Sequence, residues 1–510
     1  MRRALPPARE HPTFGGGMTE KRGFWDNRIV FIMAVIGSAV GLGNIWRFPY
    51  VCYSNGGGAF LIPYMVALLT AGVPLLILEF GLGHKMGKSA PMAFAEIRKK
   101  YEWIGWFAVL IGLMVMTYYG VVMGWCFSYL FYSVDLAWGS DSNSFFFKDF
   151  LNLSGGIGEL GGIVPIVLLG LFLCWLCVFF CIYKGVETVG KVVLFTVPVP
   201  LVILVVFVVR GVTLPGAVEG LKFFLTPDFS ALANPKVWLA AYGQVFFSLS
   251  IGFGVMVAYA SFLPKDSDIV NNAFISSFAD ALISFIAGLA VFSALGYLAV
   301  STGKPVTEVV SSGPGLAFVT FPAIIGMLPF WAAAFGVLFF LLLLTLGIDS
   351  AFSLVEAGVA GAMDKWKNAR IVVNAAISFM AFAIGIIYTT RAGLYWLDII
   401  DYYFTQYGLA LVGILECLII GYVFGAKKIR DHVNATSDFK VGIWWDICIR
   451  IITPAALTAM FIQTLIQLVK KPYEGYPGWA QFAGGWGLLA LVLIIAVALS
   501  LVRAKEAGEE

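Results

Sequence analysis

Apolar residues in this chain form long continuous blocks, separated by short charged or turn-rich segments. Each block exceeds the about 18 residues that a helix needs to cross the hydrocarbon core of a bilayer. We therefore predict an all-α polytopic membrane protein. Its twelve expected spans lie at residues 28–53, 58–83, 104–133, 162–182, 188–210, 237–262, 268–299, 329–362, 368–388, 394–424, 443–469 and 478–503.

The composition supports this fold class and excludes others. Of the 510 residues, 60% are hydrophobic and 12% are charged, whereas roughly 25% are charged in a typical soluble domain. A soluble enzyme, a nucleic-acid binder and a secreted disulfide scaffold are excluded. Cys174, Cys177 and Cys181 share one helical face, but no histidine lies near them, so we expect them to pack rather than to bind a metal.

The positions of the basic residues predict the orientation. Twelve spans put both termini on one side, and of the 33 Lys and Arg residues, 23 lie on that side, 8 on the opposite side and 2 within spans. The positive-inside rule then makes both termini cytoplasmic, in a multi-pass protein of the cell (inner or plasma) membrane. Residues 1–21 are expected to form a mobile cytoplasmic tail.

Two of the expected spans are interrupted by dense glycine and serine. The first contains the run 37–44, followed by Arg47 and Pro49, and the sixth contains the run 248–254. Glycine weakens a helix, and unwound backbone in a membrane is tolerated only where protein or a cavity covers it. Interruptions at matching positions of two halves indicate a transporter binding site. Glycines that merely allow close helix packing remain the alternative.

Several specific stretches accompany these breaks. They are GSAVGLGNIWRFP at 37–49, NGGGAFLIPY at 55–64, GQVFFSLSIGFG at 243–254 and LGIDS at 346–350. With them, residues 22–505 resemble the neurotransmitter:sodium symporter family, and in particular its bacterial amino-acid transporters of the leucine-transporter type. The resemblance implies a 5+5 inverted repeat with broken helices 1 and 6. The two repeats would be residues 22–210 and 211–424, and residues 425–510 would add two helices and a short tail.

The resemblance also implies a Na⁺-coupled importer of a hydrophobic L-amino acid that works by alternating access. Facing helix ends suit a zwitterion, because helix N-terminal amides attract a carboxylate and free carbonyls accept from an ammonium. Monoamine carriers of the family have an aspartate near the position of Gly41, which favours an amino acid here. The implied substrate-binding residues are Ser38, Ala39, Leu42, Gly43, Val115, Tyr119, Phe247, Ser248, Ser250, Phe253, Ser350 and Leu354. From composition alone, the aromatic members could equally be packing residues.

Two sodium sites are implied in the same region. The first would use Ala39, Asn44, Ser248 and Asp280, and the second Gly37, Val40, Leu346, Asp349 and Ser350. The two carboxylates support this independently, since a charge at the centre of a membrane helix costs about 2.5 to 3.5 kcal/mol and needs a partner. An Arg or Lys partner is the alternative to a bound cation.

Asp280 is where the chain departs from much of the family. Chloride-dependent members bind their anion with a tyrosine, a glutamine, two serines and an asparagine. Tyr64, Gln244, Ser248 and Ser284 match this set, but an acid stands where the asparagine is expected. Because a fixed carboxylate supplies the negative charge and repels chloride, we predict chloride-independent transport.

The expected gates close each face in turn. Arg47 and Asp401 match the outer pair of the family, with Phe247 as a lid. Arg22 and Asp364 match the inner pair, with Trp25 packing nearby. For Arg22, a simple topology signal explains the residue equally well.

Two other features bear on the inner side. Phe262 stands where the family has a tyrosine in the inner network. Gly190 and Pro200 flank the part of span five that unwinds in the family, although a static kink at Pro200 is an even alternative.

A second class of function stays open at this point, namely a non-transporting amino-acid sensor or a channel on the same scaffold. Enzymatic activity is not expected, because no combination of nucleophile, base and orienting group lies near either break. Beyond Na⁺, a small-molecule substrate and lipid, no organic cofactor or nucleic-acid partner is expected. The oligomeric state and any proton counter-transport are left open.

Overall fold

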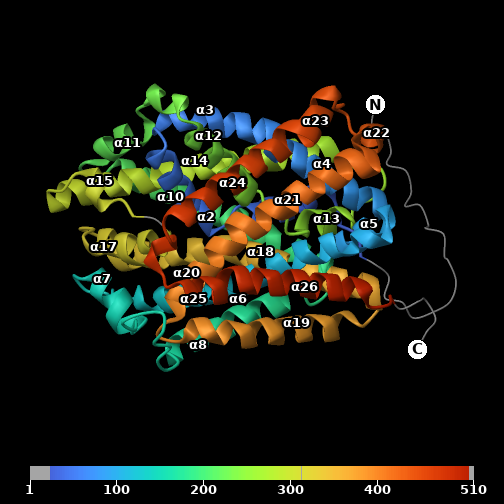
Figure 1. Cartoon of the computed structure of the whole chain (residues 1–510). Coiled ribbons are helices and arrows are strands. Elements are labelled where there is room, and N and C mark those ends of the chain that lie inside the picture. The colour runs from blue at the N-terminus through green and yellow to red at the C-terminus, as the bar shows by residue number, and fades with distance from the viewer. Residues whose placement is uncertain (1–22, 312, 505–510) are drawn as a thin grey trace, which may run out of the picture.

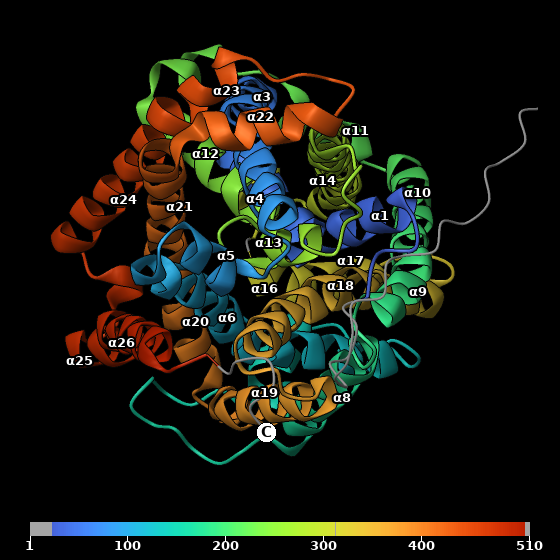
Figure 2. The same ribbon diagram turned by 90° about the vertical axis from the view of Figure 1, so that its right-hand side faces the viewer.

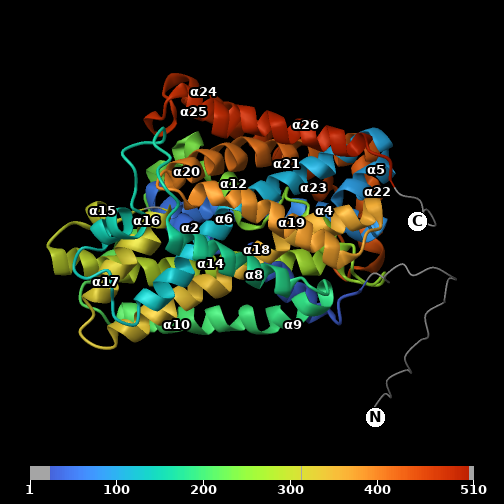
Figure 3. The same cartoon turned by 90° about the horizontal axis from the view of Figure 1, so that it is seen from below.

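The computed structural model describes residues 23–311 and 313–504, and within these ranges the ordered elements are helices. Their long axes run roughly parallel across the molecule (Figure 1). The short helices α5 (Ala90–Ile97) and α22 (Ala426–Thr436) lie at one end, and α11 (Ala217–Leu225) and α17 (Phe321–Gly326) lie at the other. Figure 3 shows the same division from below.

The first five expected spans fall on helices close to the predicted bounds. They are α1 (Arg28–Ala39) with α2 (Leu42–Ser54), α3 (Leu61–Ala67) with α4 (Val73–Met86), α6 (Glu102–Tyr132), α8 (Pro165–Cys181), and α9 (Val186–Thr196) with α10 (Pro198–Val212).

The next seven follow in the same way. They are α12 (Pro235–Ser248) with α13 (Val255–Ala260), α14 (Ile269–Thr302), α18 (Ala332–Trp366), α19 (Arg370–Gly385), α20 (Gly393–Tyr403) with α21 (Leu409–Leu418), α23 (Ile443–Ile447) with α24 (Thr453–Lys470), and α25 (Gly478–Gln481) with α26 (Gly487–Leu501). The remaining short helices are α7 (Ser142–Ser144), α15 (Val306–Val309) and α16 (Gly313–Gly315).

An all-α membrane fold is confirmed, whereas the count of twelve spans stays a prediction. Within the described residues, nine helices are long and apolar enough to cross a membrane, and the pair α1 and α2 adds a tenth span bent by 57°. The other two expected spans are α8, with 17 residues, and the interrupted pair α12 and α13. The inverted repeat and its boundaries also stay predictions.

Both expected breaks are present, and local sequence explains them. Between α1 and α2, Val40 and Gly41 are extended, and the side-chain oxygen of Asn44 accepts from the Gly41 amide at 2.8 Å, which caps the new helix. Between α12 and α13, Gly252 and Gly254 have φ values of +82° and +73°. Glycine adopts this left-handed backbone without steric cost, so the second break is also encoded locally.

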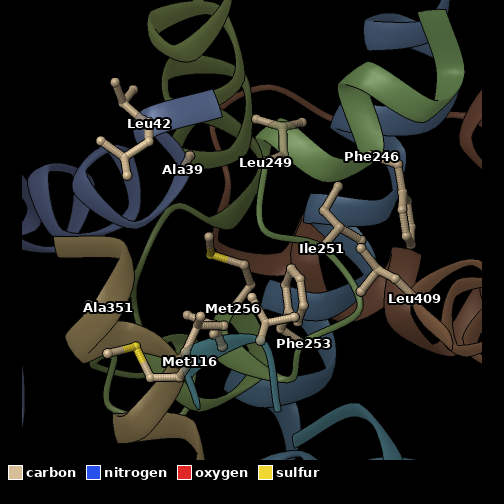
Figure 4. Close-up of a cluster of buried hydrophobic side chains, with 14 of the residues drawn as sticks. Ala39, Leu42, Met116, Phe246, Leu249, Ile251, Phe253, Met256, Ala351 and Leu409 are labelled. Carbon is tan, nitrogen blue, oxygen red and sulfur yellow. The ribbon is translucent and has the colours of Figure 1, made fainter. Parts of the chain in front are cut away.

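The breaks lie inside the bundle rather than on its surface. Seen from the α5 and α22 end, α4, α13 and α18 lie towards the centre, while α10, α19, α24 and α26 lie at the rim (Figure 2). Figure 4 shows Leu249, Ile251 and Phe253 of the second break among buried side chains of several other helices. Unwound backbone at this depth is therefore covered by protein on all sides.

Candidate functional site

A single backbone carbonyl links the two interrupted spans, one and six, with span eight. The Ser38 oxygen, at the end of α1, accepts a hydrogen bond from the Ser250 hydroxyl at 2.8 Å and from the Ser350 hydroxyl at 3.1 Å. Ser250 lies in the break of span six, and Ser350 lies in α18. Three of the residues expected around the substrate are thus in direct contact, and the Ser38 hydroxyl also bonds Ser353 at 2.8 Å.

Four polar side chains converge where the first sodium was expected. The Asn44 amide donates to Asp280 at 2.8 Å and to Ser284 at 2.7 Å, and the Ser248 hydroxyl donates to Asp280 at 2.8 Å. These four side chains are at most 5% exposed. Asp280 is therefore surrounded by hydroxyl and amide groups, and none of the salt bridges among the described residues involves it. Ser284 was expected only in the anion set, and Ala39, the fourth residue expected at this sodium site, is buried at the end of α1.

Two more polar side chains of the expected anion set are buried near this cluster. The Tyr64 hydroxyl lies close enough to Asp280 to interact with it electrostatically. It also faces the Ser284 hydroxyl, whereas the amide nitrogen and oxygen of Gln244 have no hydrogen-bond partner among the described residues. Burying an amide without partners is costly, so these atoms are available to a ligand or to water.

The second expected sodium site brings α1, α9 and α18 together. One oxygen of Asp349 accepts from the Thr196 hydroxyl at 2.6 Å. The other oxygen faces Gly37 so closely that a Cβ atom at this glycine would lie 2.5 Å from it. Val40 of span one and Leu346 of α18 are also buried, with 2% and 5% of their surface exposed. The sequence reasoning missed Thr196, which is the last residue of α9, between Gly190 and Pro200.

Tyr119 and the amino terminus of α2 form the expected carboxylate side. The Tyr119 hydroxyl lies beside the Leu42 backbone, and a Cβ atom at Gly41 would lie 3.5 Å from this hydroxyl and 2.8 Å from that of Ser350. At Gly43, a Cβ atom would lie 3.2 Å from the Phe247 ring. The glycines at 41 and 43 therefore let the Ser350 hydroxyl and the Phe247 ring pack closely against this helix end.

Apolar side chains line the expected side-chain pocket on α6. A Cβ atom at Gly112 would lie 3.2 Å from Leu354 and 3.5 Å from Phe253, so both side chains pack against the same turn of α6. Val115, three residues further along, is 6% exposed. Figure 4 shows Phe253, from the break of span six, beside Met116 of α6.

The outer gate residues are close together but do not form a direct ion pair. The Arg47 guanidinium lies over the Phe247 ring at 4.3 Å from its centroid. Asp401 accepts from the Tyr118 hydroxyl at 2.5 Å and interacts with Arg47 electrostatically. Sequence reasoning assigned no role to Tyr118, and here its hydroxyl donates to the acid of the expected pair.

The inner gate residues are only partly described. Arg22 lies outside the described residues. The Trp25 indole donates to the Tyr259 carbonyl at 2.9 Å, and its backbone amide donates to the Phe262 carbonyl at 3.2 Å. Asp364 accepts from the amide and the hydroxyl of Ser89, each at 2.7 Å. Trp25 is thus tied to the end of span six, and Asp364 is tied to the start of α5.

Comparison with known proteins decides the family. The model of the sodium:neurotransmitter symporter family matches residues 22–144 and 137–506, which is nearly the whole chain. The chain belongs to the sodium:neurotransmitter symporter family. It is therefore a multi-pass membrane transporter that uses Na⁺ and carries a small molecule.

Relatives of this symporter include archaeal and animal proteins. It is 43% identical to an uncharacterised sodium-dependent transporter of Methanocaldococcus jannaschii, over 95% of the symporter and 98% of the relative. It is 37% identical to the human sodium- and chloride-dependent GABA transporter 2, over 95% of the symporter and 87% of the relative. The rat sodium- and chloride-dependent taurine transporter is 34% identical, over 95% and 85% of the two chains.

Proposed function

We propose that this symporter imports a hydrophobic L-amino acid together with two Na⁺ ions, independently of chloride and by alternating access. The observation that carries the proposal is the meeting of the two breaks at the Ser38 carbonyl, with buried Asp280 bonded to Asn44 of α2 and buried Asp349 facing Gly37 of α1. This arrangement places backbone groups of interrupted helices close to two buried acids that need cations. Both are what a zwitterion and sodium require.

The substrate class follows from the groups at the helix ends. The amino terminus of α2 offers the amides of Leu42 and Gly43, with the Tyr119 hydroxyl beside them, to a carboxylate. The carbonyls near Ala39, Phe247 and Ser248, that of Ser38 among them, would receive the ammonium. GABA and taurine, named for two of the relatives, are also zwitterions. The side chains of Phe253 and Leu354 favour a larger apolar substrate here.

Two sodium sites are proposed because each buried acid requires a cation. The first ion would lie between Ala39, Asn44, Ser248, Asp280 and the substrate carboxylate, so that substrate and ion strengthen each other's binding reciprocally. The second would lie between the carbonyls of Gly37, Val40 and Leu346 and the side chains of Asp349 and Ser350. Thr196, which donates to Asp349, would orient this acid.

Two sodium ions supply enough free energy for concentrative uptake. Falling through 100 mV, they release about 4.6 kcal/mol, since each charge contributes about 2.3 kcal/mol. A tenfold gradient for each adds about 2.8 kcal/mol, and the total sustains roughly 10⁵-fold accumulation.

The proposed cycle moves spans one, two, six and seven as a bundle against the remaining spans. The Phe247 and Arg47 stack would close the outer face, and contacts of Arg22, Trp25 and Asp364 would close the inner face. With both termini in the cytoplasm, the end that carries α5 and α22 faces inwards. Exposed ion pairs are worth about 0 to 1 kcal/mol, which suits contacts that open in every cycle.

The first test scans the twenty amino acids for stabilisation of the purified protein. Binding to the folded state raises its melting temperature, so a hydrophobic amino acid should do so in sodium and not in potassium. If no amino acid shifts melting in sodium, the proposed substrate class is wrong.

The second test distinguishes a symporter from a sensor or a channel. Proteoliposomes with a sodium gradient should accumulate the stabilising amino acid above its external concentration. Binding without uptake would indicate a sensor, and equilibration without accumulation would indicate a channel.

A further inference from the structure

Two acids that the proposed sodium sites do not use meet in the interior of the protein. Glu79 lies on α4, in span two, and Glu416 lies on α21, in span ten. Both side chains are fully buried, and their carboxyl groups are in contact with each other. Glu79 also accepts a hydrogen bond from the Gly252 amide at 2.7 Å, within the break of span six. The pair therefore joins spans two, six and ten.

The surroundings of the pair are apolar. Gly252 packs against Leu409 of α21 and against Phe246, and Figure 4 shows Ile251 of the break beside Leu409. The titratable neighbour that interacts with both acids is the Cys417 thiol. Among the described residues, no Lys, Arg or His forms a salt bridge with either acid.

Three of the four carboxyl oxygens have no donor from the rest of the described protein. They are one oxygen of Glu79 and both oxygens of Glu416. Two carboxylates in contact, away from water and without a cation, cannot both be ionised. One proton between them removes the repulsion and supplies the missing hydrogen bond.

We propose that Glu79 and Glu416 form a proton-binding site, in which a protonated Glu416 donates a hydrogen bond to the carboxylate of Glu79. The Gly252 amide determines which acid is ionised. It donates to Glu79, and a backbone donor stabilises the charged form of the group that it contacts. The ligand is a single proton. It is held separately from the acids assigned to sodium, Asp280 and Asp349.

The position of the pair links its proton to movement, a step that rests on the proposed function. Glu79 and Gly252 belong to the proposed bundle, whereas Glu416 belongs to the spans against which the bundle moves. When these parts separate and water enters, the O–H bond of Glu416 breaks and the proton passes to water. Closing the pair again requires a proton to be taken up.

Infrared spectroscopy of the full-length protein in liposomes tests the site itself. The carbonyl stretch of a protonated carboxyl group is separate from that of a carboxylate, so Glu416→Gln should remove the signal of one protonated carboxyl. The glutamine amide can still donate to Glu79, so the variant should fold. Glu219→Gln is the matched control, because Glu219 is exposed and pairs with Lys222 on the surface.

Three results would overturn the proton site. They are an unchanged protonated-carboxyl signal in Glu416→Gln, the same loss in Glu219→Gln, and a wild-type signal that appears only after sodium is removed. The third would mean that a metal ion, rather than a proton, holds the two acids together.

The pH dependence of uptake tests the link to movement. Where release of one proton limits transport, the initial rate of the wild type should change up to tenfold per pH unit, and Glu416→Gln should flatten this slope. Equal slopes in the two proteins would overturn the link. If the wild type accumulates no amino acid but the infrared signal is lost in Glu416→Gln, the proposed function fails and the proton site stands.

Discussion

The charge of Asp280 can be removed almost without changing its shape, which makes Asp280→Asn the sharpest test of the proposed ion coupling. The acid accepts hydrogen bonds from Asn44 and Ser248, and an asparagine oxygen can accept the same bonds. Tyr64, Gln244 and Ser284 stay in place. What changes is the fixed negative charge beside them.

Coulomb's law gives the size of the effect. A carboxylate and a chloride roughly 5 Å apart, at an effective dielectric constant of about 20, repel each other by about 3 kcal/mol. That is a factor of about 200 in affinity. Removing the charge should therefore let chloride bind to the Tyr64 hydroxyl and to the Gln244 amide, which lacks a partner among the described residues, at ordinary extracellular concentrations. Sodium at the first site loses its anion unless chloride replaces it.

The assay is sodium-driven uptake in proteoliposomes with chloride or gluconate as the external anion. The wild type should transport equally in both. Asp280→Asn should transport in chloride and lose most of its uptake in gluconate, through a higher sodium requirement. Asp149→Asn, at an exposed acid between α6 and α8, is the control and should behave like the wild type. Wild-type uptake that needs chloride, or equal uptake of Asp280→Asn in both anions, would refute the electrostatic reasoning.

Three further substitutions test other parts of the structure. Gly37→Ala would place a Cβ atom 2.5 Å from a carboxyl oxygen of Asp349. Because such overpacking costs about 1–3 kcal/mol, the sodium concentration needed for amino-acid binding should rise about 5- to 150-fold. An unchanged sodium requirement would count against the second sodium site. Tyr119→Phe removes a hydroxyl expected to bind a carboxylate, a bond worth about 1.5–3 kcal/mol; amino-acid affinity, measured by thermal shift, should fall about tenfold or more. Lys365→Met takes from Glu102 its fully buried cation and leaves it only the largely exposed Lys99; breaking a buried pair costs up to about 3–5 kcal/mol, so the melting temperature should fall, and Glu102→Gln in the same chain should restore most of it.

The sequence predicted the breaks well because their cause is local. Glycine density at 37–44 and 248–254 marks the interruptions, and the helices end at Ala39 and Ser248 and resume at Leu42 and Val255. No long-range contact is needed for this step. The same holds for the helix ends, most of which lie within a few residues of the ends of the apolar blocks.

Contacts between distant segments were less predictable. Glu79 and Glu416 each lie in an apolar span, and an acid within a membrane span by itself indicates a functional role. No sequence pattern, however, indicates that the two acids meet. Thr196 is a similar case, because its hydroxyl donates to Asp349, which lies 153 residues further along the chain. The helix α22 was expected only as a loop, although its buried residues Ile429 and Val433 have helical spacing and pack against Gly81 of α4.

The partners of the gate and substrate residues depend on what the site holds, and sequence cannot specify this. Buried polar groups are almost always hydrogen-bonded, so Ser250 and Ser350 both donate to the Ser38 carbonyl. A ligand that separates the two hydroxyls from this carbonyl must itself donate hydrogen bonds. Otherwise the polar groups are left without partners, at a cost of about 1–3 kcal/mol each. An ammonium carries three donors and satisfies the exchange, whereas a methyl group carries none. The contacts at the Ser38 carbonyl therefore support the proposed substrate class, whose members carry an amine.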